Sequence, residues 1–261
     1  MEFFDSHSHY NDEKFNDDRE EIIKETYISG ITKFICAGYD IESSKKSLEI
    51  ANKYEYIYSI CGVSPNDAPQ DLSQIESLLE QLEEIIKSDE KHRIVAIGEI
   101  GLDYYWNKEN KEIQNELFIK QIKLANKYDL PIVIHTREAI EDTIKILKEN
   151  EVINKGVFHC CPLNRELIKQ GLNLDFYISF AGPITFKNSK NAEEIVNMVP
   201  LDRILIETDS PYLSPEPKRG RRNDSRNVKY VAEKIAEFRN LGIQDIAKTT
   251  YDNAKKIFKI L

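Results

Sequence analysis

Residues 3–9 read FFDSHSH, a short apolar run that ends in two histidines one residue apart. Seven similar runs follow, rich in β-branched and aromatic residues, and most lack polar alternation, as is typical of strands buried in a parallel sheet. We predict strands at Phe3–His7, Ile31–Ala37, Ile57–Cys61, Ile94–Glu99, Ile132–His135, Gly156–Cys160, Phe176–Phe180 and Ile204–Glu207. Segments with helical periodicity lie between them, most clearly Glu109–Asp129 and Ser73–Lys87. This alternation predicts an α/β protein, a (β/α)8 TIM barrel formed by residues 1–261 as one domain.

Composition narrows the class of protein. The chain is 41% hydrophobic and 31% charged, which is ordinary for a globular protein with a substantial core. Its net charge of −9 argues against a passive coat on nucleic acid, which needs basic surface. No apolar stretch approaches a membrane span, and no secretory signal is visible. The four cysteines lack CxxC spacing, so we expect a cytoplasmic protein whose thiols are reduced and serve as small apolar residues.

Side chains that bind metals follow the predicted strands. In a TIM barrel the carboxyl ends of the strands meet on one face, where the chemistry takes place. His7 and His9 end or follow the first run, Glu99 ends the fourth and His135 the fifth, His159 lies in the sixth, and Asp209 follows the eighth. Only one histidine of five, His92, falls elsewhere. The sequence therefore predicts that these six side chains form a metal site.

The mixture of four imidazoles and two carboxylates is too rich for one tetrahedral ion. It suits two divalent ions about 3.5–4 Å apart, an arrangement used for in-line displacement at phosphorus. We expect His7, His9, Glu99 and Asp209 at one ion, and the shared Glu99 with His135 and His159 at the other. Zinc or manganese fits the nitrogen-rich set, with magnesium bound more weakly. Glu99 and Asp209 are the expected catalytic residues; Asp209 has a second possible role, in orienting or deprotonating the attacking water.

Longer motifs resemble those of a known family. In order, DSHSHYN, VAIGEIGLDYY, LPIVIHTREA, GVFHCC, FYISFAGPITFKN, ILIETDSPYLSP, RGRRN and TTYDNAKKIF are similar to the signatures of TatD-family metal-dependent deoxyribonucleases, which belong to the amidohydrolase-type TIM-barrel superfamily. The resemblance covers essentially the whole chain and implies that the six residues above are its metal ligands. It also implies DNA, as single strands or 3′ ends, as the substrate, with 3′–5′ exonuclease action.

Several residues depart from the family pattern where substrate would bind. After the third strand the family usually has G-[VI]-H-P-H, whereas this chain reads GVSPN, so Ser64 and Asn66 replace two histidines thought to contact phosphate. Both can still donate hydrogen bonds, and we expect them to bind substrate. Lys218, also expected to bind substrate, stands where the family commonly has histidine. It begins the basic run KRGRRNDSR, in which Arg219, Arg221 and Arg222 either follow a DNA backbone or are simply solvated.

Other side chains near the strand ends leave alternatives open. Arg137 either binds a phosphate or pairs with Glu138 or Glu141. The aromatic run Tyr104–Trp106 either stacks a base or packs over the barrel mouth, and we expect Glu207 to support the ions indirectly.

Two other functions are compatible with the same barrel. One is a small-molecule amidohydrolase or deacylase, because fold and metals alone do not separate substrates. The other is a metal-binding protein whose catalysis has decayed, as the replaced histidines suggest. The main hypothesis is a metal-dependent phosphodiesterase acting on DNA, with a metal-activated water attacking phosphorus.

Overall fold

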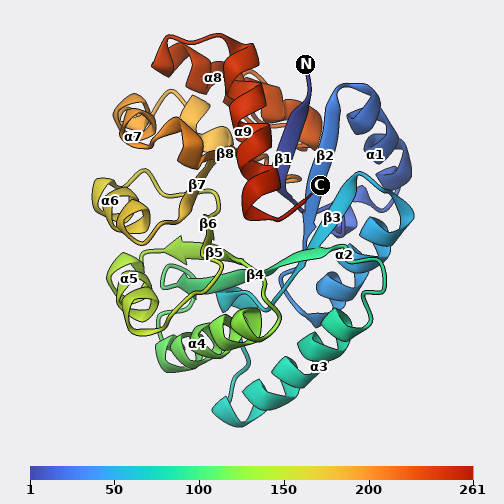
Figure 1. The fold of residues 1–261 in the computed structure, drawn as a ribbon, viewed down its shortest axis with the longest axis vertical. Helices are drawn as coiled ribbons and strands as arrows, with labels where there is room; N and C mark the ends of the chain where they lie inside the picture. Colours follow the sequence, from blue (N-terminus) through green and yellow to red (C-terminus); the bar gives the residue numbers. More distant parts are fainter. Residues whose placement is uncertain (261) are drawn as a thin grey trace.

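The computed structural model describes residues 1–260 and contains the predicted barrel. Eight parallel strands pair in chain order, from β1 to β8, in one sheet (Figure 1). They are β1 Phe3–Ser8, β2 Ile31–Ala37, β3 Ile57–Cys61, β4 Ile94–Asp103, β5 Ile132–Arg137, β6 Gly156–Phe158, β7 Tyr177–Phe180 and β8 Ile204–Ile206. The barrel nearly closes where the end of β1 meets the chain beyond β8: Ser8 forms a parallel bridge with Ser210, and the Asp209 N–H donates to the His7 carbonyl.

Helices separate the strands and lie around the outside of the barrel (Figure 1). They are α1 Arg19–Ile28, α2 Ile41–Lys53, α3 Ile75–Lys87, α4 Lys111–Lys127, α5 Ile140–Glu149, α6 Arg165–Asn173, α7 Ala192–Met198, α8 Val228–Arg239 and α9 Ile243–Ile257. Short 3-10 helices are η1 Glu13–Phe15, η2 Pro65–Asp67, η3 Leu72–Gln74, η4 Gly182–Thr185, η5 Leu201–Arg203 and η6 Ser225–Asn227. None of the helices in residues 1–260 combines the length and the apolar character that crossing a membrane requires.

Local sequence explains where several helices begin and end. Asp40 caps α2: its carboxylate accepts from the Ser43 N–H, and the Ser43 hydroxyl oxygen accepts from the Asp40 N–H. The Asn164 side chain caps α6 by accepting from the Leu167 N–H. Asn240 ends α8 in the left-handed conformation, which asparagine tolerates better than most residues. Capping residues therefore mark the starts of α2 and α6 and the end of α8.

The interior of the barrel is filled by apolar side chains and covered by the C-terminal helix. One buried cluster draws on all eight strands, which is possible only inside the barrel: Phe4, Ile35, Ala37, Ile60, Val95, Ala96, Val133, Val157, Tyr177 and Leu205. The same cluster contains Ala254 and Ile257 of α9, followed by Phe258 and Ile260. These residues pack on Phe4, whose ring lies 6.4 Å from that of Phe258. The opposite, carboxyl end of the barrel is left for polar side chains.

Three strand ends differ from the prediction in ways that matter for the site. β4 was expected to end at Glu99, but it continues to Asp103 after a register shift between Ile97 and Ile100. Such a bulge re-aims the side chains beside it. β5 also runs two residues further than predicted, to Arg137, whereas β6 ends at Phe158 and leaves His159 just beyond the strand. The predicted boundaries were wrong there because strand pairing, rather than apolar composition, decides where a strand stops.

Glycine allows β5 to lie close to both of its neighbours. A Cβ at Gly101 would lie 2.0 Å from the His135 carbonyl oxygen, and one at Gly156 would lie 2.1 Å from the Ile132 oxygen. Gly101 also has a φ of +136°, which side chains with a Cβ rarely adopt. The two glycines therefore bring His135 and its strand close to the strands on either side.

Candidate metal centre

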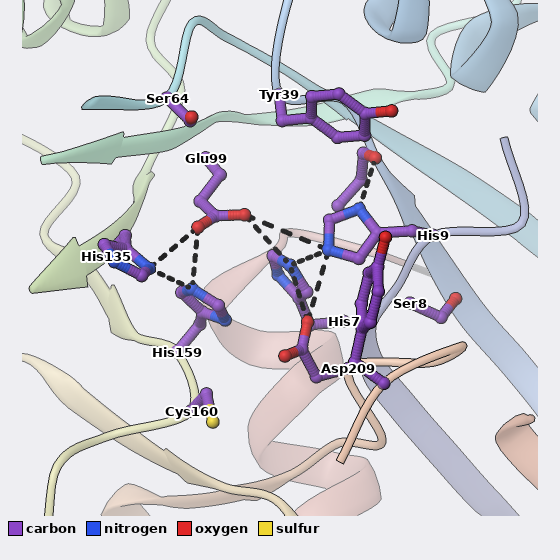
Figure 2. A network of polar contacts seen from close by, with 12 residues as sticks. His7, Ser8, His9, Tyr39, Ser64, Glu99, His135, His159, Cys160 and Asp209 are labelled. Carbon is purple, nitrogen blue, oxygen red and sulfur yellow. Dashed lines mark hydrogen bonds and ion pairs between the residues drawn. The ribbon is translucent and has the colours of Figure 1, made fainter. Parts of the chain in front are cut away.

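The six residues predicted as ligands come together at the carboxyl end of the barrel (Figure 2). His7 lies in β1, Glu99 in β4 and His135 in β5, whereas His9, His159 and Asp209 lie just beyond β1, β6 and β8. Most are buried: His7 is fully enclosed, and His9, His159 and Glu99 are each less than 10% exposed. His135 and Asp209 keep 21% and 15% of their side chains accessible. Solvent therefore reaches the cluster at these two residues.

Glu99 divides the cluster into two groups of donor atoms. Its Oε1 lies 2.9 Å from His135 Nδ1 and 3.2 Å from His159 Nε2. Its Oε2 lies 3.7 Å from His7 Nε2 and 3.9 Å from His9 Nε2. Figure 2 shows the two pairs of histidines on opposite sides of the carboxylate. One carboxylate thus faces both sets of nitrogens.

Asp209 completes the group on the His7 side. Its Oδ1 lies 3.2 Å from His9 Nε2 and 3.9 Å from His7 Nε2, and these two nitrogens lie 3.2 Å from each other. Asp209 has a φ of +55°, so the chain turns sharply here and does not continue the line of β8. Within residues 1–260, Oδ2 of Asp209 makes no hydrogen bond or ion pair. One oxygen therefore faces the histidines and the other remains available.

Acceptors outside the cluster hold three of the four histidines through their distal nitrogens. His9 Nδ1 lies 3.0 Å from the Ala37 carbonyl oxygen, which can only accept, so this nitrogen carries the proton. His135 Nε2 lies 2.9 Å from Asp103 Oδ2, and His159 Nδ1 lies 3.3 Å from Glu207 Oε1. Acceptors in these places fix the tautomer and turn the other nitrogen toward a metal. In all three residues the other ring nitrogen points into the cluster.

Electrostatics in the cluster are dominated by buried carboxylates. Burial would raise the pKa of Glu99, but the charge of His159 and a hydrogen bond from His135 hold it well below its usual range. Burial would likewise lower the pKa of His159, yet Glu99 and Glu207 raise it well above its ordinary value. Burial and the charge of His159 lower the pKa of His7. The carboxylates thus stay ionised and demand positive charge beside them.

Divalent cations fit these donors. Ligands of a tetrahedral ion with bonds of about 2.1 Å lie about 3.4 Å apart. The neighbouring donor atoms in each group are 2.9–3.9 Å apart, and several are nitrogens facing nitrogens or carboxylate oxygens. Such lone pairs repel unless a proton or a metal lies between them. Donor spacing, tautomers and negative charge all match a metal site.

The predicted contacts to phosphate after β3 are directed elsewhere. The Ser64 hydroxyl donates to Asp67 Oδ2 at 2.6 Å and accepts from the Asn66 N–H at 3.2 Å, which caps η2. The Asn66 side chain is 3.4 Å from Asp103 Oδ2. The structure therefore engages both residues in contacts within the protein, and their binding of substrate stays a prediction.

The predicted basic residues have different surroundings. Arg137 does not pair with Glu138 or Glu141 in the described chain; its guanidinium lies 3.9 Å from the centre of the Tyr105 ring. Arg219 lies 3.7 Å from the centre of the Phe186 ring, and Arg222 pairs with Asp18 of the loop before α1. For Lys218 and Arg221, no ion pair is found within residues 1–260. The run is therefore partly structural, and only some of its cations are free to meet a ligand.

Asp103 is the residue of the site that the sequence analysis missed. It is fully buried, and it joins the His135 imidazole to the loop that follows β4. Asp103 was missed because β4 was predicted to end at Glu99, although an aspartate four residues beyond a candidate ligand was a visible signal.

Glu207 has the indirect position that we expected, because it bonds His159 and the Cys160 N–H. All four cysteines are free, and three are buried, as predicted for small apolar residues.

Comparisons with known proteins agree with this geometry. A family model described as TatD related DNase matches residues 4–259. The chain is 42% identical over 259 residues to YabD of Bacillus subtilis, named an uncharacterized metal-dependent hydrolase, and the match covers 98% of this chain and 99% of YabD. It is 33% identical over 267 residues to YcfH of Escherichia coli K12, which has the same description, covering 100% and 97% of the two chains. Among solved structures, YjjV, a TatD homolog from Escherichia coli, superposes with a TM-score of 0.91 at 26% identity, covering 99% of this chain and 98% of YjjV.

Proposed function

The chain belongs to the TatD-related DNase family of metal-dependent hydrolases, and we propose on this premise that it hydrolyses phosphodiester bonds in DNA at a centre of two divalent ions. The observation that carries the proposal is the position of Glu99, whose two oxygens face separate groups of histidines. A carboxylate shared by two ions is the arrangement used for in-line displacement at phosphorus.

Each ion would have its own ligands. His7, His9, Asp209 and Oε2 of Glu99 would hold the first, and His135, His159 and Oε1 of Glu99 the second. When bound, manganese, zinc or magnesium would supply positive charge that stabilises the phosphate and makes a nearby water more acidic. The protein would contribute orientation, because Asp103, Glu207 and the Ala37 carbonyl keep the imidazoles turned inward.

Asp209 is the proposed base of the reaction. Its Oδ2 makes no hydrogen bond within the described residues, and the side chain is 15% exposed, so a water would be able to reach it. In the proposed step the water oxygen forms a bond to phosphorus while the P–O3′ bond breaks. The water proton passes to Oδ2 of Asp209, and the leaving oxygen takes a proton from solvent. Repeated at a 3′ end, this step gives 3′–5′ exonuclease action.

The substrate would lie across the open side of the centre. His135 and Asp209 are its accessible members. Arg137 is the last residue of β5, and Lys218, Arg219 and Arg221 lie in the loop that follows β8. Cations there would offset the overall negative charge where a phosphate chain approaches.

We also propose that residues 1–261 act as one domain, because a single sheet draws on segments from Phe3 to Ile206.

A cleavage assay with matched variants tests the function. Purified protein is incubated with end-labelled single-stranded DNA and Mg²⁺ or Mn²⁺, alongside Glu99→Gln, Asp209→Asn and the exposed control Glu151→Gln. We expect Asp209→Asn, which removes the proposed base, to lose at least about 100-fold in rate. Glu99→Gln, which removes the charge of the shared ligand, should lose at least as much, and the control should match the wild type.

Other outcomes point to other functions. Equal residual cleavage in all the proteins would reveal a contaminant and contradict the proposal. Turnover of an amide panel without cleavage of DNA would favour an amidohydrolase or deacylase instead. Stoichiometric metal without turnover of either substrate would favour a catalytically impaired metal-binding protein.

A further inference from the structure

Two large aromatic side chains are exposed beside the metal centre. Tyr104, Tyr105 and Trp106 follow one another after β4, but only Tyr104 is buried, and its hydroxyl donates to Asp142 at 2.7 Å. Tyr105 is 46% exposed and Trp106 is 68% exposed. Packing against α4 and α5 therefore accounts for Tyr104 and leaves its two neighbours unexplained.

Arg137 joins the two exposed rings into one surface. Its guanidinium carbon lies 3.9 Å from the centre of the Tyr105 ring and 5.5 Å from that of Trp106. The rings meet edge to face, with centres 4.8 Å apart and planes at 86°. We call Tyr105, Trp106 and Arg137 the aromatic platform. It combines open π surface with a positive charge.

Asp103 connects the aromatic platform to the candidate metal ligands. Its Oδ1 accepts from the N–H groups of Tyr105 and Trp106 at 2.9 and 3.1 Å, while its Oδ2 lies 2.9 Å from His135 Nε2. Arg137 is also the register partner of Asp103 in the β4–β5 pair, two residues beyond His135. One buried carboxylate thus positions both the platform and an imidazole of the centre.

We propose that the aromatic platform stacks an unpaired nucleobase of the DNA substrate next to the phosphodiester that is cleaved. This inference rests on the proposed function and names the side chains that would hold the unpaired base. Stacking on an aromatic ring tolerates every base, and the guanidinium attracts the neighbouring phosphate. A base within a duplex already stacks on its neighbours, so the platform favours frayed or single-stranded ends.

Fluorescence provides a direct test, because Trp106 is the only tryptophan in the chain. The full-length protein with Mn²⁺ is titrated with an oligothymidylate whose phosphorothioate linkages slow its cleavage. A matched oligomer of abasic sugars carries the same linkages without bases. We expect the oligothymidylate to quench the tryptophan emission and the abasic oligomer to leave it unchanged. Equal responses to the two oligomers would contradict stacking.

Kinetics separate a binding surface from a structural one. On a phosphodiester oligothymidylate, Trp106→Ala is expected to raise KM about 5- to 100-fold with little change in kcat, whereas Trp106→Phe retains most of the affinity. On the abasic oligomer, wild type and Trp106→Ala are expected to behave alike. Tyr27→Ala removes a comparably exposed aromatic ring, 44% accessible at the end of α1, and serves as the control. Melting curves check that each variant is folded.

The outcomes distinguish the platform from the function beneath it. Suppose that wild type cleaves both oligomers. If Trp106→Ala then raises KM equally for both oligomers, or for neither of them, the platform proposal is wrong and the proposed function stands. If wild type cleaves neither oligomer, the proposed function fails and the platform proposal fails with it. If Trp106→Ala raises KM only for the oligomer that carries bases, the result supports both the platform and the proposed function.

Discussion

At the scale of single residues, the centre depends on what lies behind each imidazole. Three histidines are held by an acceptor on the nitrogen that faces away from the cluster. The acceptors come from β2, from β4 and from the residue just beyond β8. His7 is the exception: within residues 1–260 its Nδ1 has no hydrogen-bond partner, although the ring is fully buried. Orientation of His7 must therefore come from packing, and its ring stacks on that of His159 with centres 4.1 Å apart.

Asp103→Asn tests this support at one imidazole. An amide can accept a hydrogen bond but lacks the charge that strengthens the bond from His135, so the second ion should bind more weakly. We expect its affinity to fall about 10- to 100-fold while the first ion is little affected. Competition with a chromogenic chelator measures both constants. Unchanged affinity for both ions would show that His135 needs no carboxylate partner.

At the scale of elements, the strands around β5 tolerate no added volume. β5 lies between β4 and β6, and both contacts pass through a glycine, Gly101 on one side and Gly156 on the other. The first of these contacts places His135 beside the strand that carries Glu99. Close approach of three backbones therefore underlies one half of the candidate centre.

Gly156→Ala tests how closely β5 and β6 are packed. The new Cβ would lie 2.1 Å from the Ile132 carbonyl oxygen, so β5 and β6 would have to separate. We expect a loss of about 3 kcal/mol or more in the free energy of unfolding, measured by urea denaturation.

Gly220→Ala is the matched control for this substitution. Gly220 has no atom within 4 Å of a built Cβ and a φ of +80°, so only backbone strain of about 1–2 kcal/mol is expected. Equal losses in the two variants would contradict the argument from crowding.

Helices α3 and α4 are joined by a charged contact that should respond to pH. Hydrogen bonds from Lys127, Lys87 and Tyr128 lower the pKa of Glu83 to about 2. The pKa of an unfolded glutamate is about 4.3, so folding favours the ionised form. The contact therefore stabilises the protein fully above that value and is lost as the pH falls toward about 2.

Glu83→Gln measures this contribution. We expect the variant to melt at a lower temperature than wild type at pH 7 and the difference to shrink as the pH approaches 3. Glu80→Gln changes an exposed glutamate of α3 for which no ion pair is found within residues 1–260, and it serves as the matched control. A difference independent of pH would mean that the ionised contact is not what stabilises Glu83.

At the scale of the whole molecule, the candidate centre joins strands from the beginning, middle and end of the chain. Its members range from His7 to Asp209, and the ends of β1 and β8 meet beside it. Cations there would relieve the repulsion between buried carboxylates. They would also stabilise the contact between the end of β1 and the chain beyond β8, where the barrel closes. Metal binding should therefore be visible in the stability of the entire fold.

Adding metal to stripped protein measures that link. At a free Mn²⁺ concentration about 100 times the dissociation constant, binding adds about 2.7 kcal/mol and should raise Tm by roughly 5 °C or more. Glu99→Ala should lose most of the shift because it removes a ligand from both groups. Calorimetry measures Tm with and without Mn²⁺. If Mn²⁺ raised Tm equally in wild type and variant, the metal would be bound at a site that does not include Glu99.

The sequence by itself determined the barrel and the identity of the six candidate ligands. Strand and helix periodicities are local, and the ends of parallel strands share one rim, so ligand types placed after successive strands had to converge. Only the tertiary structure decided which oxygen of Glu99 faces which histidines. It also decided that Asp103 contacts the outer nitrogen of His135 and that the Ser64 hydroxyl donates to Asp67. Those outcomes depend on strand register and on competition for hydrogen bonds between residues distant in the chain, and neither is encoded in spacing along the sequence.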